Sequence, residues 1–174
     1  PTTKLGEEIG ADMAICTDPD GCRFAASFRT NINSNKLTYI TANEIASVIL
    51  HFILSHLKEQ GKIKKELLYI KTSASTSLAT DIAKEFGISY VDYLFVGYKW
   101  IGQVVQKMNH PENFVFSFED TCGYCRGDFI RDKDGSIGAL TVAEIVSTLK
   151  DQGKTLTDYL NDLYSTYGYY RNIL

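Results

Sequence analysis

The sequence lacks several features that define whole classes of protein. No apolar run approaches the roughly 20 residues that a membrane-spanning helix requires. The opening segment, PTTKLGEEIG, has no hydrophobic region of the kind found in signal peptides. With 18 basic and 21 acidic residues, the net charge of −3 provides no cationic surplus for nucleic-acid phosphates. We therefore expect no nucleic-acid partner, no membrane partner and a cytoplasmic location.

Cysteine is also scarce, since the 174 residues include only Cys16, Cys22, Cys122 and Cys125. The last two have the CxxC spacing that occurs in redox centres and in half of many zinc sites. No second CxxC and no nearby histidine completes a zinc set. We interpret these cysteines as reduced and unrelated thiols, which agrees with the expected compartment.

The pattern of apolar residues predicts an α/β fold. Strand-like segments at 66–70, 88–94 and 114–118 alternate with helix-like segments at 43–60, 75–87, 98–108 and 138–153. This alternation predicts a mixed, mainly parallel sheet with flanking helices. In such sheets, ligands bind at the loops that leave the carboxyl ends of the strands.

The first forty residues have a different pattern. They contain three short strand-like segments, ADMAICT, RFAASF and LTYI, and no helix of their own to cover them. We interpret residues 1–40 as the end of another unit, followed by a domain over 41–150. A last helical pattern over 151–174 forms a tail.

One acidic loop, TDPDGCR at 17–23, follows the first strand-like segment. Asp18 and Asp20 occupy alternate positions and can direct two hard oxygen donors at one cation, as Mg²⁺ prefers. A solvated acidic turn containing Pro and Gly is the simpler alternative. A further alternative is a phosphatase of the haloacid-dehalogenase type with Asp18 as the nucleophile. Against that alternative, Cys22 stands where such a motif usually has Thr.

Several segments together resemble the phosphoglucomutase/phosphomannomutase (α-D-phosphohexomutase) superfamily. ITANEIA resembles its LTGNEIG-type helix start, VGYKWIG resembles TGFKWIG, and FEDTCGY resembles FEESCGY. With TDPDGCR before them and IRDKDG, GKTL and YGYY after them, these segments cover almost the whole chain in order. The resemblance implies that 1–40 ends domain II, that 41–150 is the sugar-binding domain III, and that 151–174 leads toward an absent domain IV.

The same resemblance implies an activity and its cofactors. Members interconvert hexose 1-phosphate and hexose 6-phosphate, with Mg²⁺ and a glucose 1,6-bisphosphate-type activator. The family's phosphoserine lies in a TASHNP-like segment, and the sequence contains none. We therefore expect a fragment that needs the remaining domains of the same parent chain for turnover. A noncatalytic homologue is the other possibility.

The resemblance also implies three groups of site residues. The metal loop would consist of Asp18, Asp20 and Cys22. Arg23 would place a fixed charge beside the phosphate, and Lys133 would lie near the reacting phosphate as a catalytic cation. Substrate contacts would come from five residues: Lys71, Gly97, Tyr98, Glu119 and Thr121.

The sequence departs from the family at the metal loop. Cys22 stands where the family has a third metal-binding Asp, and a thiol is a poor ligand for Mg²⁺. We therefore expect weakened Mg²⁺ binding. Simpler structural roles also exist: Lys71 and Lys133 as surface charges, Glu119 as a helix-capping acid, and Tyr98 as a packing aromatic.

Overall fold

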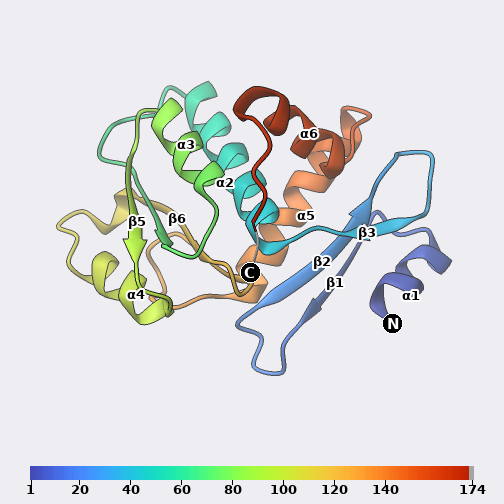
Figure 1. The fold of residues 1–174 in the computed structure, drawn as a ribbon, viewed down its shortest axis with the longest axis horizontal. Coiled ribbons are helices and arrows are strands. Elements are labelled where there is room, and N and C mark those ends of the chain that lie inside the picture. The colour runs from blue at the N-terminus through green and yellow to red at the C-terminus, as the bar shows by residue number, and fades with distance from the viewer. Residues whose placement is uncertain (173–174) are drawn as a thin grey trace.

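Two β-sheets of different kinds organise the protein in the computed structural model, which describes residues 1–172 (Figure 1). The smaller sheet is antiparallel and contains β1 (Met13–Thr17), β2 (Phe24–Arg29) and β3 (Leu37–Tyr39). The larger sheet has the order β5-β4-β6-β7 and contains β4 (Leu68–Thr72), β5 (Ser89–Leu94), β6 (Phe114–Glu119) and β7 (Gly123–Arg126). Strands β5, β4 and β6 are parallel and β7 is antiparallel to β6. The predicted mixed, mainly parallel sheet is confirmed, although β7, which begins within the CxxC segment, was not predicted.

Helices cover both sheets. They are α1 (Thr2–Ile9), α2 (Ala42–Glu59), α3 (Ser77–Glu85), α4 (Tyr98–Gln106), α5 (Gly135–Asp151) and α6 (Leu156–Tyr167), with a 3₁₀ turn, η1 (Pro111–Asn113). The central helix α2 begins with a capping box. The Thr41 side chain accepts from the Glu44 amide at 3.3 Å, and the Glu44 carboxylate accepts from the Thr41 amide at 2.8 Å. Gly61, at φ +65°, follows its end.

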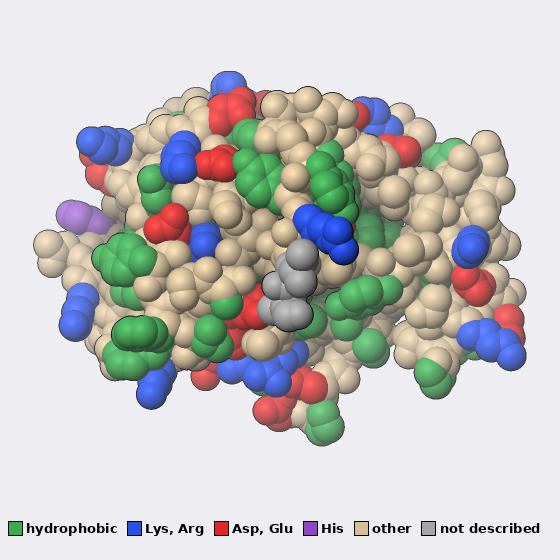
Figure 2. Space-filling view, in the orientation of Figure 1, with side chains coloured by type: hydrophobic (Ala, Val, Ile, Leu, Met, Phe, Trp, Pro, Cys, Tyr) green, Lys and Arg blue, Asp and Glu red, His purple; other side chains and the backbone are tan. Residues whose placement is uncertain are grey.

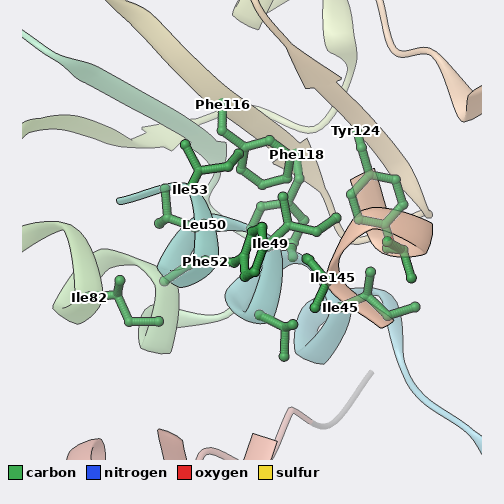
Figure 3. Packing of buried hydrophobic residues seen from close by; sticks show 14 of the residues in the cluster. Ile45, Ile49, Leu50, Phe52, Ile53, Ile82, Phe116, Phe118, Tyr124 and Ile145 are labelled. Carbon is green, nitrogen blue, oxygen red and sulfur yellow. The ribbon is translucent and has the colours of Figure 1, made fainter. Parts of the chain in front are cut away.

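The main core lies between α2 and the larger sheet (Figure 3). Ile45, Ile49 and Ile53 of α2 recur at helical spacing and are buried against Phe116 and Phe118 of β6. On the opposite face of the sheet, α4 packs in a second cluster with Ile70 and Phe114. Both faces of the parallel part are therefore covered, which gives three layers, helix on sheet on helix.

The prediction that the first three strands lack a covering helix is wrong. Helix α1 packs against β1 and β3, and helices α5 and α6 lie beside β2. Phe24 and Phe28 of β2 are 1% exposed and belong to the main core. Helix α1 is short, and α5 and α6 lie more than one hundred residues further along the chain, so local periodicity could not reveal these contacts. The division at residues 40 and 150 stays a prediction.

The surface agrees with the charge balance of the sequence. Lys and Arg side chains alternate with Asp and Glu side chains over the face shown in Figure 2. Within residues 1–172, none of the helices has both the length and the apolar content needed to cross a bilayer. The cytoplasmic location stays a prediction.

Candidate functional site

The acidic loop is a tight turn between β1 and β2. The Asp18 carbonyl accepts from the Gly21 amide at 3.0 Å, and Gly21 has φ +72°, which glycine adopts most easily. The Asp18 Oδ1 accepts from the Arg23 amide at 3.0 Å, and the Asp20 Oδ1 accepts from the Cys22 amide at 3.3 Å. One ligand atom each from Asp18, Asp20 and Cys22 lie within 4.8 Å of one another. The structure therefore brings together the three residues of the predicted metal loop.

The thiol in this loop is protonated near neutral pH. Desolvation, reinforced by a hydrogen bond with Asp20, raises the pKa of Cys22 to about 11. The same thiol is the largest cause that lowers the pKa of Asp20, and its Sγ also lies 3.6 Å from the Asp18 Oδ2. The two carboxylates fit a hard cation such as Mg²⁺, but the thiol does not. The complete donor set therefore does not fit Mg²⁺.

The acidic loop forms one wall of a cleft of about 600 Å³. The opposite wall is the segment that precedes α5. Asp20, Gly21, Cys22, Ile130, Arg131, Asp132, Lys133 and Asp134 line this cleft. The two walls are joined where the Gly135 amide donates to the Gly21 carbonyl at 3.0 Å. A Cβ atom at position 135 would lie only 2.6 Å from that carbonyl oxygen, so this junction requires glycine.

Lys133 connects the cleft with the end of β6. A Cβ on Gly123 would lie 2.8 Å from the Lys133 Cδ and 3.0 Å from the Glu119 Cγ, so both side chains pass close to this glycine. The Lys133 Nζ lies 5.5 Å from the centroid of the Tyr98 ring, within the range of a cation–π interaction. It also lies 3.3 Å from the Asp132 Oδ1. The predicted catalytic cation and the predicted sugar-binding acid are therefore neighbours.

Glu119 occupies the carboxyl end of β6, where the sequence places it. Its side chain accepts from the Thr121 hydroxyl at 3.1 Å, and the residue is only 3% exposed. Thr121 itself is exposed. The acid is thus oriented by the turn that follows β6, and the simpler role of a helix cap does not apply, because β6 leads into β7.

Two predicted substrate contacts are not directed into the cleft. The buried Lys71 Nζ donates to the carbonyls of Thr72 at 3.3 Å, Ser75 at 3.1 Å and Asp92 at 3.4 Å. Burial lowers the pKa of Lys71, although the ammonium keeps these three acceptors. As a result its cation is directed at the backbone, and its contact with substrate phosphate stays a prediction.

Tyr98 is likewise buried, and its hydroxyl lies 2.7 Å from the Ser117 Oγ. Burial raises the pKa of Tyr98 well above its ordinary value, so the hydroxyl stays protonated. Gly97 precedes α4 with φ +120°, a conformation that favours glycine. The hydroxyl is therefore engaged inside the protein, and the ring serves as a platform under Lys133. The contacts of Gly97 and Tyr98 with sugar stay predictions.

Arg131 is a site residue that the sequence reasoning missed. It is exposed, lines the cleft, and donates from Nη1 to the carbonyls of Asp128 and Ile130. Its signal was present, because IRDKDG places four charged residues in succession, and only Lys133 among them was predicted as a site residue. Arg23, predicted as the other cation, is exposed at the end of the acidic loop.

The fold and the cleft define an α/β domain in which an acidic loop faces a segment that carries both basic and acidic side chains across a shared space. Residues 34–167 match the family described as phosphoglucomutase/phosphomannomutase, alpha/beta/alpha domain III. Because this match covers more than half of the chain, the chain belongs to the phosphoglucomutase/phosphomannomutase family. The family assignment favours a phosphomutase over the haloacid-dehalogenase alternative, while the role of the acidic loop, which lies outside residues 34–167, stays a prediction.

Curated relatives agree with this assignment. The chain is 31% identical over 171 residues to a phosphomannomutase of Mycoplasma genitalium and 29% identical over 171 residues to a phosphoglucomutase of Staphylococcus aureus. Each alignment covers 98% of this chain and 30% of the relative. The chain therefore spans about a third of the length of these mutases.

Solved structures support the fold. The Paramecium phosphoprotein parafusin, a phosphoglucomutase, superposes with a TM-score of 0.70 at 18% identity, covering 91% of this chain and 25% of that protein. A phosphoglucomutase/phosphomannomutase family protein of Burkholderia thailandensis gives a TM-score of 0.68 at 14% identity, covering 92% and 31%.

Proposed function

We propose that this chain supplies the acidic-loop and sugar-contacting part of a phosphohexomutase, an isomerase that interconverts hexose 1-phosphate and hexose 6-phosphate. The observation that carries the proposal is the shared cleft. The acidic loop and Lys133 line it together, and Lys133 passes over Gly123 beside Glu119. A ligand with a phosphate at one end and hydroxyls at the other matches this order of groups.

Structures of distant family relatives indicate the class of ligand. Aspergillus fumigatus N-acetylphosphoglucosamine mutase has been solved with GlcNAc-6P and magnesium, and that structure aligns with a TM-score of 0.50. The same enzyme in complex with glucose 1,6-bisphosphate aligns with a TM-score of 0.57. We therefore propose a phosphorylated hexose as the substrate of the parent protein and a hexose bisphosphate as its activator.

The residues of the cleft can act on such a ligand mainly by positioning and charge, which dominate phosphoryl transfer. Lys133 and Arg23 supply positive charge for the phosphate. The Glu119 carboxylate, held by Thr121, can accept from two sugar hydroxyls and so orient the ring. A divalent cation at Asp18 and Asp20 is part of the proposal, because paired carboxylates attract one.

The phosphoserine and the remaining domains belong to the parent protein in this proposal. The isolated chain should therefore bind hexose phosphate without converting glucose 1-phosphate to glucose 6-phosphate. The complete parent should catalyse that conversion in a coupled assay. Robust turnover by the isolated chain would contradict the fragment interpretation.

Binding can be tested on the chain directly by calorimetric titration with glucose 6-phosphate. Lys133→Ala should weaken binding about tenfold, or about 1.4 kcal/mol, because it removes a charged partner of the phosphate. Lys62→Ala is the matched control, since Lys62 is an exposed lysine that does not line the cleft. Equal affinities for the two variants would contradict the proposed phosphate position.

A substitution in the acidic loop of the complete parent can distinguish a catalytic mutase from a noncatalytic homologue. Cys22→Asp should increase the Mg²⁺-dependent rate if the parent is a mutase with an altered metal loop. An unchanged absence of turnover in both proteins would instead indicate a noncatalytic role.

A further inference from the structure

The acidic loop presents a mixed set of donor atoms. Asp18 and Asp20 each offer a carboxylate oxygen, and Cys22 offers a sulfur, with all three atoms within 4.8 Å of one another. Mg²⁺ takes oxygen ligands in near-octahedral geometry and does not favour sulfur. Zn²⁺ takes sulfur, nitrogen and oxygen ligands in tetrahedral sites. The chemistry of the loop therefore disagrees with the metal that the family resemblance implies.

One distance in the loop can be compared with the spacing of ligand atoms in these two kinds of site. Neighbouring oxygens on an octahedral Mg²⁺ lie about 2.9 Å apart, given Mg–O bonds of about 2.0–2.1 Å. A sulfur and an oxygen on a tetrahedral Zn²⁺ lie about 3.5–3.7 Å apart, given Zn–S of about 2.3 Å and Zn–O of about 2.0–2.2 Å. The Cys22 Sγ and the Asp18 Oδ2 are 3.6 Å apart. In the absence of an ion this contact is a hydrogen bond from the thiol to the carboxylate, and its length also falls within the range of a tetrahedral sulfur–oxygen edge.

The surroundings of the loop are compatible with a bound cation. The Asp18 Oδ1 and the Asp20 Oδ1 are each held by a backbone amide, so both carboxylates are oriented before any ion arrives. When the metal–sulfur bond forms, the thiol proton leaves to solvent. The resulting negative charge lies in the same cleft as Lys133, which offsets it.

We infer that this loop binds a thiophilic divalent cation, Zn²⁺ or Co²⁺, in preference to Mg²⁺, with Asp18, Asp20 and Cys22 as its ligands. The fourth coordination position opens onto the cleft, where a phosphate oxygen or water completes the tetrahedron. The role of that cation in the cleft rests on the proposed function, but the metal preference is a property of this chain alone.

The test uses Co²⁺ as a spectroscopic probe on the reduced chain. Tetrahedral Co²⁺ bound to a thiolate gives an intense near-ultraviolet charge-transfer absorption that carboxylate ligation does not give. We expect this absorption to saturate at one Co²⁺ per chain, and to disappear when an equal amount of Zn²⁺ is added. A large excess of Mg²⁺ should leave it unchanged.

Variants identify the ligand. Cys22→Ser should remove the absorption and lower Zn²⁺ affinity on the order of 100-fold, because a hydroxyl replaces the thiolate. Cys16→Ser is the matched control, since Cys16 is an exposed thiol outside the three-residue group, and it should retain the absorption. Cys22→Asp should lose the absorption and gain Mg²⁺ affinity.

The inference is overturned if Co²⁺ gives no thiolate absorption, if Cys22→Ser retains it, or if Mg²⁺ displaces Zn²⁺ at equal concentration. Calorimetry with glucose 6-phosphate separates the two proposals. Loss of hexose-phosphate binding with an intact thiolate absorption would contradict the proposed function and leave the metal preference standing. Hexose-phosphate binding without a thiolate absorption would contradict the metal preference and leave the proposed function standing.

Discussion

The acidic loop and the proposed sugar cradle, a group that we define as Glu119, Thr121, Tyr98 and Ser117, are built in opposite ways. The loop lies at the surface and is held by hydrogen bonds to its own backbone amides. In the cradle, Glu119, Tyr98 and Ser117 are buried between β6 and α4, with only Thr121 exposed. In a surface loop of this kind, one metal-ligating side chain can be substituted by another without any change in core packing. The cradle does not allow such a substitution, because its functional groups are also part of the core.

This difference has a consequence for how the two regions vary. Replacing Cys22 by Asp should alter the chemistry of the loop while leaving its turn intact. A comparable change at Tyr98 or Ser117 would leave a buried polar group without its partner. Ligand preference should therefore change at the loop more readily than at the cradle.

The largest effect is expected from Phe118→Ala, in the core on the α2 side of the strand that carries Ser117 and Glu119. Phe118 is fully buried beside Glu119, so the substitution should lower the free energy of unfolding by about 3–5 kcal/mol. Urea denaturation followed by circular dichroism measures this loss. Cys22→Ala in the loop is the matched comparison and should change stability by less than about 0.5 kcal/mol. Similar losses in both variants would break the distinction between the two regions.

The next largest effect is expected at the junction of the cleft walls. Gly135→Ala should cost about 1–3 kcal/mol, because its Cβ would meet the carbonyl oxygens of Gly21 and Arg23 at 2.6 and 2.8 Å. Since both obstacles are backbone atoms, relief requires the acidic loop to move, so Co²⁺ affinity should fall as well. The neighbouring exposed Ser136→Ala is the control. An unchanged unfolding midpoint for Gly135→Ala would refute the close junction.

Tyr98→Phe separates the role of the Tyr98 hydroxyl from the role of its ring. Loss of the hydrogen bond to Ser117 should cost about 1 kcal/mol, while the ring under Lys133 remains. Proton NMR can follow this ring, because an aromatic face shifts the resonances of the nearby Lys133 ε-methylene. That shift should persist in Tyr98→Phe and disappear in Tyr98→Leu. Its persistence in the leucine variant would exclude the cation–π contact.

The smallest expected effect is electrostatic. Cys22→Ala removes the hydrogen bond that contributes most to the lowered pKa of Asp20, so that pKa should rise toward its ordinary value. A carbon-detected NMR titration of the Asp20 carboxyl measures the change. The control Cys16→Ala should leave the pKa of Asp20 unchanged. A shift of equal size in that control would show that the Cys22 thiol does not cause the lowered pKa.

Much of the fold could be predicted because its signals are local. The stripe of Ile45, Ile49 and Ile53 and the capping residue Thr41 define α2 within eighteen residues of sequence. The alternation of strands and helices then predicts the parallel sheet. Strand β7 escaped because it is four residues long and begins within a CxxC segment that was interpreted only through its cysteines. The packing of β2 against α5 and α6 depends on contacts between distant residues, which periodicity does not carry.

The places of the candidate residues in the fold could be predicted, but the orientations of their side chains could not. Motifs correctly placed Lys71 and Glu119 at neighbouring strand ends. They could not show that three backbone carbonyls surround the Lys71 ammonium, because those acceptors come from two strands and the loop before α3. The close approach of Lys133 to Gly123 was equally hidden, since it depends on how β7 turns back beside β6.

Helix α5 is fastened to the β1–β2 hairpin at both of its ends. Its first residue, Gly135, bonds to Gly21 at the hairpin turn, and Lys150 near its last turn pairs with Asp12, just before β1, at 2.7 Å. The contact at Gly21 is tightly packed and the ion pair at Asp12 is exposed, so the turn end of the hairpin is held more firmly than its open end. A ligand of the proposed kind would therefore meet a preassembled turn, and selectivity there should depend on which atoms line the turn rather than on how it closes.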